Sequence, residues 1–135
     1  MFKWNLVQAK SIMMKKVITV YADACIYDAM DILVKEKISG LPVVNTEGNL
    51  VGIVTEKDVM RLLFTGAADN HKCVADCMTK DVVSFHPEDS VVDICALFIT
   101  KPFRRVPIIE DGKLVGVVAR RDIVSLLLTT REDVV

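Results

Sequence analysis

Hydrophobic positions along the chain alternate between a strand-like and a helix-like period. The short run VITV at residues 17–20 predicts a strand. The runs LPVV and LVGIV flank the turn NTEGN and predict a hairpin, and EKDVMRLLF after it predicts a second helix. Between strand and hairpin, a helix opening at Asp23 or Ala24 is predicted by apolar residues at i, i+3, i+4, i+7 and i+8, namely Ile26, Ala29, Met30, Leu33 and Val34.

The same β-α-β-β-α order occurs a second time. VVSF at residues 82–85 predicts a strand, VPII and LVGVV predict a hairpin, and a helix is expected from Arg120. The helix before this hairpin is expected to pass through Val91, Ile94, Cys95, Phe98 and Ile99. A long sequence repeat that occurs twice indicates two pseudo-symmetric halves of one domain, because a solenoid needs about three or more short units to bury a core. We expect repeats at residues 10–66 and 78–130, joined by a linker at residues 67–77.

Composition narrows the class of protein. A chain of 135 residues suits one domain, and 17 basic against 18 acidic residues argue against bulk binding of nucleic acid. No uncharged apolar stretch is long enough to span a membrane, and the first residues lack the apolar block of an export signal. We therefore expect a cytoplasmic protein with reduced cysteines, of which Cys25 and Cys95 are expected in the core.

The doubled motif resembles a known family. In both halves a proline-led strand and a turn glycine precede L-V-G-h-V-x-x-x-D, where h is apolar, and a helix follows. This pattern is similar to a tandem cystathionine-β-synthase (CBS) domain pair, or Bateman module, over residues 10 to 130. The resemblance implies an α+β fold of two repeats packed through their sheets. It also implies a homodimer and adenine-nucleotide binding in two clefts between the repeats.

Thr55 and Asp58 admit two interpretations. Thr-x-x-Asp before an apolar run is nearly a capping box, in which the hydroxyl and the acid satisfy backbone N–H groups at the helix start. The second copy has Ala119 in place of the threonine but keeps Asp122, whose acid is either a favourable charge at the helix start or a ligand. The family resemblance implies that these carboxylates accept hydrogen bonds from ribose hydroxyls.

A basic stretch, KPFRRVP, precedes the second hairpin. Phosphate requires cations or exposed backbone donors, and in the resembling modules basic residues before the strand proline lie against phosphate. The match falls on Arg104 and Arg105, although a solvated loop remains the alternative. The first repeat has Ser39 and Gly40 at these positions, so the two clefts are expected to differ chemically.

The resemblance assigns two residue sets. The first set has a hydroxyl, an acid and two arginines, and we expect it to bind an anionic nucleotide more tightly: Thr55, Asp58, Ser84, Phe103, Arg104 and Arg105. The second set is expected to be weaker, vacant or suited to a less charged adenosine compound: Thr19, Ile38, Ser39, Gly40, Ala119 and Asp122.

Other chemistry is less well supported. His71, Cys73 and Cys77 lie close together, but a closed zinc site usually needs four ligands. His86 precedes Pro87 in a turn and completes no Cys, His and acid trio. We therefore predict a non-catalytic sensor of AMP, ADP or ATP without metal or cofactor. The alternatives are a structural dimerisation or protein-interaction module that docks on an unidentified protein, and a module that binds S-adenosylmethionine.

Overall fold

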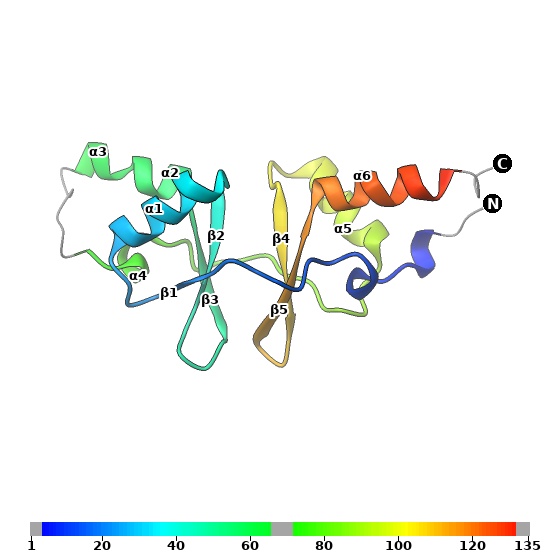
Figure 1. Cartoon of the computed structure of the whole chain (residues 1–135), viewed down its shortest axis with the longest axis horizontal. Coiled ribbons are helices and arrows are strands. Elements are labelled where there is room, and N and C mark those ends of the chain that lie inside the picture. Colours follow the sequence, from blue (N-terminus) through cyan, green and yellow to red (C-terminus); the bar gives the residue numbers. More distant parts are fainter. Residues whose placement is uncertain (1–3, 66–71, 132–135) are drawn as a thin grey trace. The chain divides into compact units, whose positions relative to one another are not determined.

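The computed structural model describes residues 4–65 and 72–131. The chain divides into two compact units, one formed by residues 18–82 and the other by the N-terminal segment to Val17 together with residues from Val83 onward. Each unit contains a β-hairpin with helices before and after it (Figure 1). This arrangement confirms the predicted α+β fold built from two repeats.

The unit of residues 18–82 has a three-stranded sheet in the order β1-β2-β3. β1 (Val20–Tyr21) runs parallel to β2 (Gly40–Val44), and β2 pairs antiparallel with β3 (Leu50–Thr55). The hairpin turn is fixed by the Asn45 side chain, whose Oδ1 accepts from the Glu47 and Asn49 backbone N–H groups at 3.0 and 2.9 Å. The described part of the unit also contains the helices α1 (Ile26–Glu36), α2 (Glu56–Met60), α3 (Leu62–Thr65) and α4 (Val74–Cys77).

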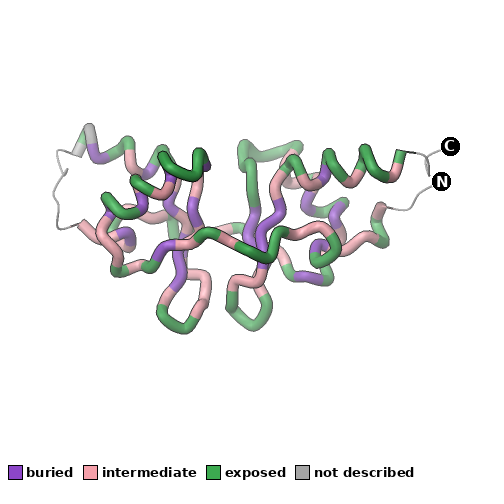
Figure 2. Tube along the Cα trace, viewed as in Figure 1, coloured by how far each residue is buried: buried purple, intermediate pink, exposed green. Residues whose placement is uncertain are grey.

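The second unit has a two-stranded sheet of β4 (Arg105–Glu110) and β5 (Lys113–Ala119). Helix α5 (Val91–Thr100) precedes this hairpin and α6 (Arg120–Thr129) follows it. The N-terminal segment adds two short 3-10 helices, η1 (Trp4–Leu6) and η2 (Ala9–Ser11). In both units buried residues follow the hairpin strands, whereas the hairpin tips are more exposed (Figure 2).

Each unit has its own hydrophobic core. In the unit of residues 18–82 the fully buried side chains come from α1, both hairpin strands and α4: Ile26, Ala29, Leu41, Val43, Val54 and Val74. In the other unit they come from η2, α5 and both hairpin strands: Ala9, Ile94, Val106, Ile108 and Val118. Burial of this apolar surface is the main stabilising contribution in both units.

The described part of the predicted linker, residues 72–77, packs against the first repeat. Its helix α4 buries Val74 completely, and the N–H of Val74 donates to the Ala24 carbonyl at 2.8 Å. The segment continues to Thr79, which exchanges two backbone hydrogen bonds with Ile53 of β3, at 2.8 and 2.9 Å. Residues 66–71 of the predicted linker lie outside the described residues.

The N-terminal segment packs on the second hairpin in the same way. Met14 exchanges backbone hydrogen bonds of 2.8 and 3.0 Å with Val117 of β5. In both units the crossing segment lies over a glycine: a Cβ built on Gly52 would lie 2.6 Å from the Met78 Sδ, and one on Gly116 equally close to the Met13 Sδ. These close approaches explain why the doubled motif contains glycine at this position.

Several sequence predictions need correction at element ends. The strand expected at residues 17–20 is the two-residue β1, and the one expected at residues 82–85 is reduced to a single parallel bridge between Phe85 and Ile108. The second strand ends early because the chain turns directly afterwards, where the His86 N–H donates to the Asp89 Oδ2 at 2.8 Å.

Helix α1 also begins later than Asp23 or Ala24. The backbone on either side of Cys25 is hydrogen-bonded to the segment at residues 72–74, which holds Cys25 in an extended conformation before the helix. Cys25 is therefore half-buried at the helix start and is not a core residue. Two residues expected on the inner helix faces, Val34 and Ile99, are 75% and 79% exposed. Cys95 is half-buried and packs against the core of its unit.

Candidate functional site

The predicted site residues of the first repeat gather at one end of its hairpin. We call this the first hairpin edge, formed by residues 38–40 and 55–58. Gly40 at the start of β2 pairs with Thr55 at the end of β3, and the Glu56 N–H donates to the Ser39 carbonyl at 3.0 Å. Ile38 is 8% exposed and belongs to the hydrophobic core, so it anchors this edge.

The second hairpin edge, formed by residues 103–105 and 119–122, has the same backbone arrangement. Arg105 at the start of β4 pairs with Ala119 at the end of β5, and the Arg120 N–H donates to the Arg104 carbonyl at 3.1 Å. Phe103, Arg104 and Arg105 are all exposed. This edge therefore has two exposed arginines, a residue type suited to binding a phosphate ester, and an exposed phenylalanine.

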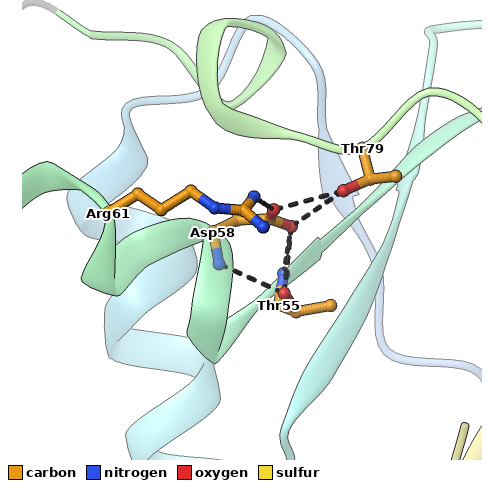
Figure 3. A network of polar contacts seen from close by, with 4 residues as sticks. All are labelled: Thr55, Asp58, Arg61 and Thr79. Atoms are coloured by element: carbon orange, nitrogen blue, oxygen red, sulfur yellow. Dashed lines mark hydrogen bonds and ion pairs between the residues drawn. The ribbon is translucent and has the colours of Figure 1, made fainter. Parts of the chain in front are cut away.

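At the first edge, the Asp58 carboxylate is the centre of a polar network (Figure 3). Its Oδ2 accepts from the Thr55 N–H at 2.9 Å and from the Thr55 hydroxyl at 3.0 Å. Its Oδ1 accepts from the Arg61 Nη1 at 2.8 Å and from the Thr79 hydroxyl at 3.1 Å. Four donors occupy a carboxylate that has about four acceptor positions, so the protein itself satisfies this buried charge.

The network includes the predicted capping box. The Thr55 hydroxyl accepts from the Asp58 N–H at 3.2 Å while the Asp58 carboxylate accepts from the Thr55 N–H, which together begin α2. Arg61 is the accessible member, because its side chain is 68% exposed whereas that of Asp58 is only 2% exposed. The exposed guanidinium can return to water when it is replaced, so a ligand hydroxyl could take the place of Arg61 more easily than that of any other donor.

Asp122 at the second edge has a different environment. Its Oδ2 accepts from the Ala119 N–H at 2.7 Å. The side-chain donors around Asp58 are largely lost here: Ala119 and Met14, which have no side-chain O–H or N–H, stand in place of Thr55 and Thr79, and the hydroxyl of Ser125 stands in place of the Arg61 guanidinium. Asp122 is only half-buried, so this carboxylate has acceptor positions that can receive a ligand's hydroxyl groups.

A groove of about 330 Å³ lies beside Asp122 within the second unit. Its wall is rich in hydroxyl groups and is made by Ser11, Ile12, Asp122, Ser125, Leu126 and Thr129. The groove joins the N-terminal segment to α6, and its side chains supply both donors and acceptors.

The two remaining predicted residues lie ahead of the first strands. Thr19 directly precedes β1, and Ser84 directly precedes the bridging residue Phe85; both are half-buried. Within each unit the structure brings together residues that were predicted to belong to different sets, such as Gly40 with Thr55 and Arg105 with Ala119. The two sets draw on both units, and their grouping stays a prediction.

Sequence reasoning missed Arg61 and Thr79 as partners of Asp58. Thr79 is 21 positions away along the chain and is brought in by the segment that crosses β3. A signal was present, because MMK at residues 13–15 and MTK at residues 78–80 match one another near the start of the two predicted repeats, ahead of their first predicted strands.

Among residues 4–65 and 72–131, no group of three or more His, Cys, Asp or Glu side chains is placed to hold a metal ion. His71 of the weighed zinc cluster lies outside these residues. Burial raises the pKa of the Cys77 thiol above its usual value, with Asp76 adding to the effect and Lys72 opposing it. None of the helices in the described part of the chain has the length and apolarity that crossing a bilayer requires.

Comparison with known proteins gives close structural and sequence relatives. The structure of CBSX2 from Arabidopsis thaliana in complex with AMP superposes with a TM-score of 0.82 at 28% identity, covering 92% of this chain and 98% of that one. The CBS domain pair of protein MJ0100, in complex with 5′-methylthioadenosine and S-adenosylmethionine, superposes with a TM-score of 0.76 at 31% identity, covering 93% and 98%.

A longer relative is inosine-5′-monophosphate dehydrogenase of Methanocaldococcus jannaschii, which is 36% identical over 119 residues and 87% of this chain. The chain spans 23% of that enzyme and 42% of another curated relative, an uncharacterized protein of the same organism. The family model described as CBS domain matches residues 9–65 and 74–129, close to the two repeats defined by the sequence pattern. The chain therefore belongs to the CBS domain family and carries the domain twice in tandem.

Proposed function

We propose that the chain is a non-catalytic regulatory module that binds an adenine nucleotide, AMP, ADP or ATP, through its two hairpin edges. The observations that carry the proposal are a helix-start carboxylate in each unit and, in the second unit, two exposed arginines at residues 104 and 105, where β4 begins. Carboxylates accept from ribose hydroxyls and guanidinium groups bind phosphate. The AMP complex of the similar CBSX2 supports this ligand class.

In this proposal Arg104 and Arg105 provide the charge for phosphate, and Asp58 provides an acceptor for ribose. Binding at Asp58 requires a ribose hydroxyl to replace the exposed Arg61 at the Oδ1, because the other donors are fixed by the capping box and by the segment that carries Thr79. The displaced guanidinium returns to water, and the ribose hydroxyl that takes its place keeps the buried carboxylate supplied with a hydrogen-bond donor. Arg61 thus controls access to the Asp58 carboxylate.

Asp122 belongs to the second predicted set, which lacks side-chain cations at Ser39 and Gly40. We propose that this set takes a ligand of lower negative charge, an adenosyl compound related to S-adenosylmethionine. Support comes from the half-buried Asp122, whose Oδ2 accepts from the Ala119 N–H at 2.7 Å, and from the two adenosyl ligands of the similar MJ0100 domain pair. The hydroxyl groups of such a ligand can bind to the Asp122 carboxylate without replacing a donor of the protein.

The proposal includes a homodimer in the cytoplasm. An apolar groove of about 250 Å³ in the second unit joins η1, α5 and α6 through Trp4, Val91, Val92, Cys95, Ala96, Ile99, Ile123, Leu126 and Leu127. Val92, Ile99 and Leu127 are exposed, and exposed apolar patches of this kind mark interaction surfaces. A second copy of this chain would bury them, and nucleotide binding would signal by changing the shape of the dimer.

One observation favours a second function. The Asp58 carboxylate already has four protein donors, so the first edge is stable without a ligand. If the hairpin edges bind nothing, the apolar helix surface becomes the functional feature, and the chain is a dimerisation or protein-docking module.

Calorimetric titration with adenosine, AMP, ADP, ATP and S-adenosylmethionine separates the two functions, after the purified protein has been shown to carry no bound nucleotide. We expect saturable binding of at least one phosphorylated adenosine compound. Absence of binding by all five compounds at millimolar concentration, with the protein folded by circular dichroism, would support the docking module instead.

A further inference from the structure

Cys25 and Cys73 face each other across an isolated antiparallel bridge in the unit of residues 18–82. The bridge is closed on both sides by backbone hydrogen bonds, from the Ile26 N–H to the Lys72 carbonyl at 3.0 Å and from the Val74 N–H to the Ala24 carbonyl at 2.8 Å. In such a pair the cysteines themselves exchange no backbone bond, which places their Cα atoms about 4.5 Å apart with side chains on the same side. Disulfides span Cα separations of about 4.4 to 6.8 Å.

The remaining cysteines are placed differently. Cys77 and Cys95 are, like Cys25 and Cys73, thiols of intermediate exposure, but Cys95 lies in the other unit. Cys77 packs against the core around α4, and its burial raises the pKa of the thiol, which lowers the fraction present as reactive thiolate. Cys73 and Cys25 each occupy the position before a helix, where an extended backbone presents the side chain.

We propose that Cys25 and Cys73 form a redox-active dithiol that closes reversibly to a disulfide by exchange with a low-molecular-weight disulfide such as glutathione disulfide. The thiolate of one cysteine attacks the external disulfide, forming a mixed disulfide and releasing one glutathione thiolate. The second cysteine's thiolate then attacks the protein sulfur of the mixed disulfide and releases the second glutathione. Two protein thiols are oxidised, one glutathione disulfide is reduced to two thiols, and the two protons pass to the products or to solvent.

Closing this pair fixes the segment that supports Asp58. The segment at residues 72–79 begins at the cysteine bridge and ends at Thr79, whose hydroxyl donates to Asp58 and whose backbone pairs with Ile53. A bond between Cys25 and Cys73 holds the start of this segment to the start of α1. Oxidation therefore stabilises the packing of α4 and, through it, the Thr79 contact at the first hairpin edge.

The test uses the full chain, reduced and then equilibrated with excess glutathione disulfide. After denaturation and alkylation with N-ethylmaleimide, intact mass should show two adducts in place of the four expected from four thiols, with no retained glutathione. Peptide mapping should identify a Cys25–Cys73 cross-link, and the melting temperature should rise by roughly 5 to 10 °C. Dithiothreitol should restore four adducts.

Matched variants assign the pair. Cys25→Ser and Cys73→Ser should each stop closure and retain one glutathione on the remaining partner, whereas Cys95→Ser should still lose two alkylation sites. Because the map is made on the parent protein, it stands even if a variant fails to fold. Four adducts after oxidation, a cross-link between Cys73 and Cys77, a disulfide between two chains or stable glutathione on Cys25 or Cys73 of the parent would each overturn the proposal.

Discussion

Replacing Asp58 by alanine should destabilise the protein far more than replacing Asp122, although the two acids occupy equivalent positions in the two repeats. Asp58 is 4% exposed and accepts from Thr55, Arg61 and Thr79. For Asp122 the corresponding protein bond is the one from the Ala119 N–H. The pair therefore separates a buried hydrogen-bond network from a simple helix-start acid.

The expected loss of unfolding free energy depends on the hydrogen bonds that each substitution removes. Asp58→Ala removes a capping box, worth about 1 kcal/mol, and charge-assisted bonds to a buried carboxylate, worth about 1.5 to 3 kcal/mol. We expect a loss of roughly 2 to 4 kcal/mol for Asp58→Ala and about 1 kcal/mol for Asp122→Ala. For a chain of 135 residues these losses correspond to decreases of about 7 to 14 °C and 3 to 4 °C in melting temperature.

Thermal unfolding without ligand, monitored by circular dichroism at 222 nm, measures the melting temperatures of both variants. Asp93→Ala is the matched control, because Asp93 is an exposed acid in the first turn of α5 and its loss should change the melting temperature by no more than about 3 °C. Equal destabilisation by Asp58→Ala and Asp122→Ala would refute the reasoning, since the network around Asp58 would then contribute nothing measurable.

Three further predictions concern packing, assembly and ligand response. Gly52→Ala should destabilise more than Gly116→Ala, because a Cβ on Gly52 meets the Thr79 carbonyl at 2.9 Å, whereas the three atoms nearest to one on Gly116 all belong to the Met13 side chain; urea midpoints measure the difference, and equal midpoints would contradict it. Light scattering at micromolar concentration should give a homodimer with and without nucleotide; a monomer mass in both conditions excludes it. A bound nucleotide should raise stability by about 2.7 kcal/mol at one hundred times its dissociation constant without being consumed, and sustained ATP hydrolysis by contaminant-free protein would argue against the sensor.

The duplicated pattern was enough to predict the fold. The same hairpin pattern, with β-branched strands and matching turn residues, occurs in both halves, so each half supports the interpretation of the other. Sequence reasoning failed at element ends, where tertiary contacts decide. Cys25 looks helical by periodicity, yet its neighbours bond to residues 72–74 and keep it extended. Val34 and Ile99 satisfy the helical spacing and are nevertheless exposed. Periodicity alone cannot distinguish a helix face that packs on the core from an apolar face that is exposed on the surface.

The capping role of Thr55 and Asp58 was predictable from the sequence, the surroundings of Asp58 were not, and the ligand role of the carboxylates and arginines stays a prediction. Thr55 and Asp58 are neighbours along the chain, so their capping box could be inferred locally. Thr79 reaches Asp58 only because a distant segment crosses β3, and no local pattern announces that contact. A difference between the surroundings of Asp58 and Asp122 was expected from Ala119, and the replacement of Thr79 and Arg61 by Met14 and Ser125 makes this difference larger.

Calorimetric titration of AMP into the parent protein, Arg105→Ala and Asp122→Ala tests the central claim most directly. Loss of Arg105, an exposed residue with little role in folding, should weaken AMP binding about tenfold to a hundredfold, with a smaller effect at high salt. The tighter AMP site should persist in Asp122→Ala, which belongs to the other residue set. If Arg105→Ala binds AMP as tightly as the parent while Asp122→Ala loses the tighter site, the proposed assignment of nucleotide to the Asp58 and Arg105 set is wrong.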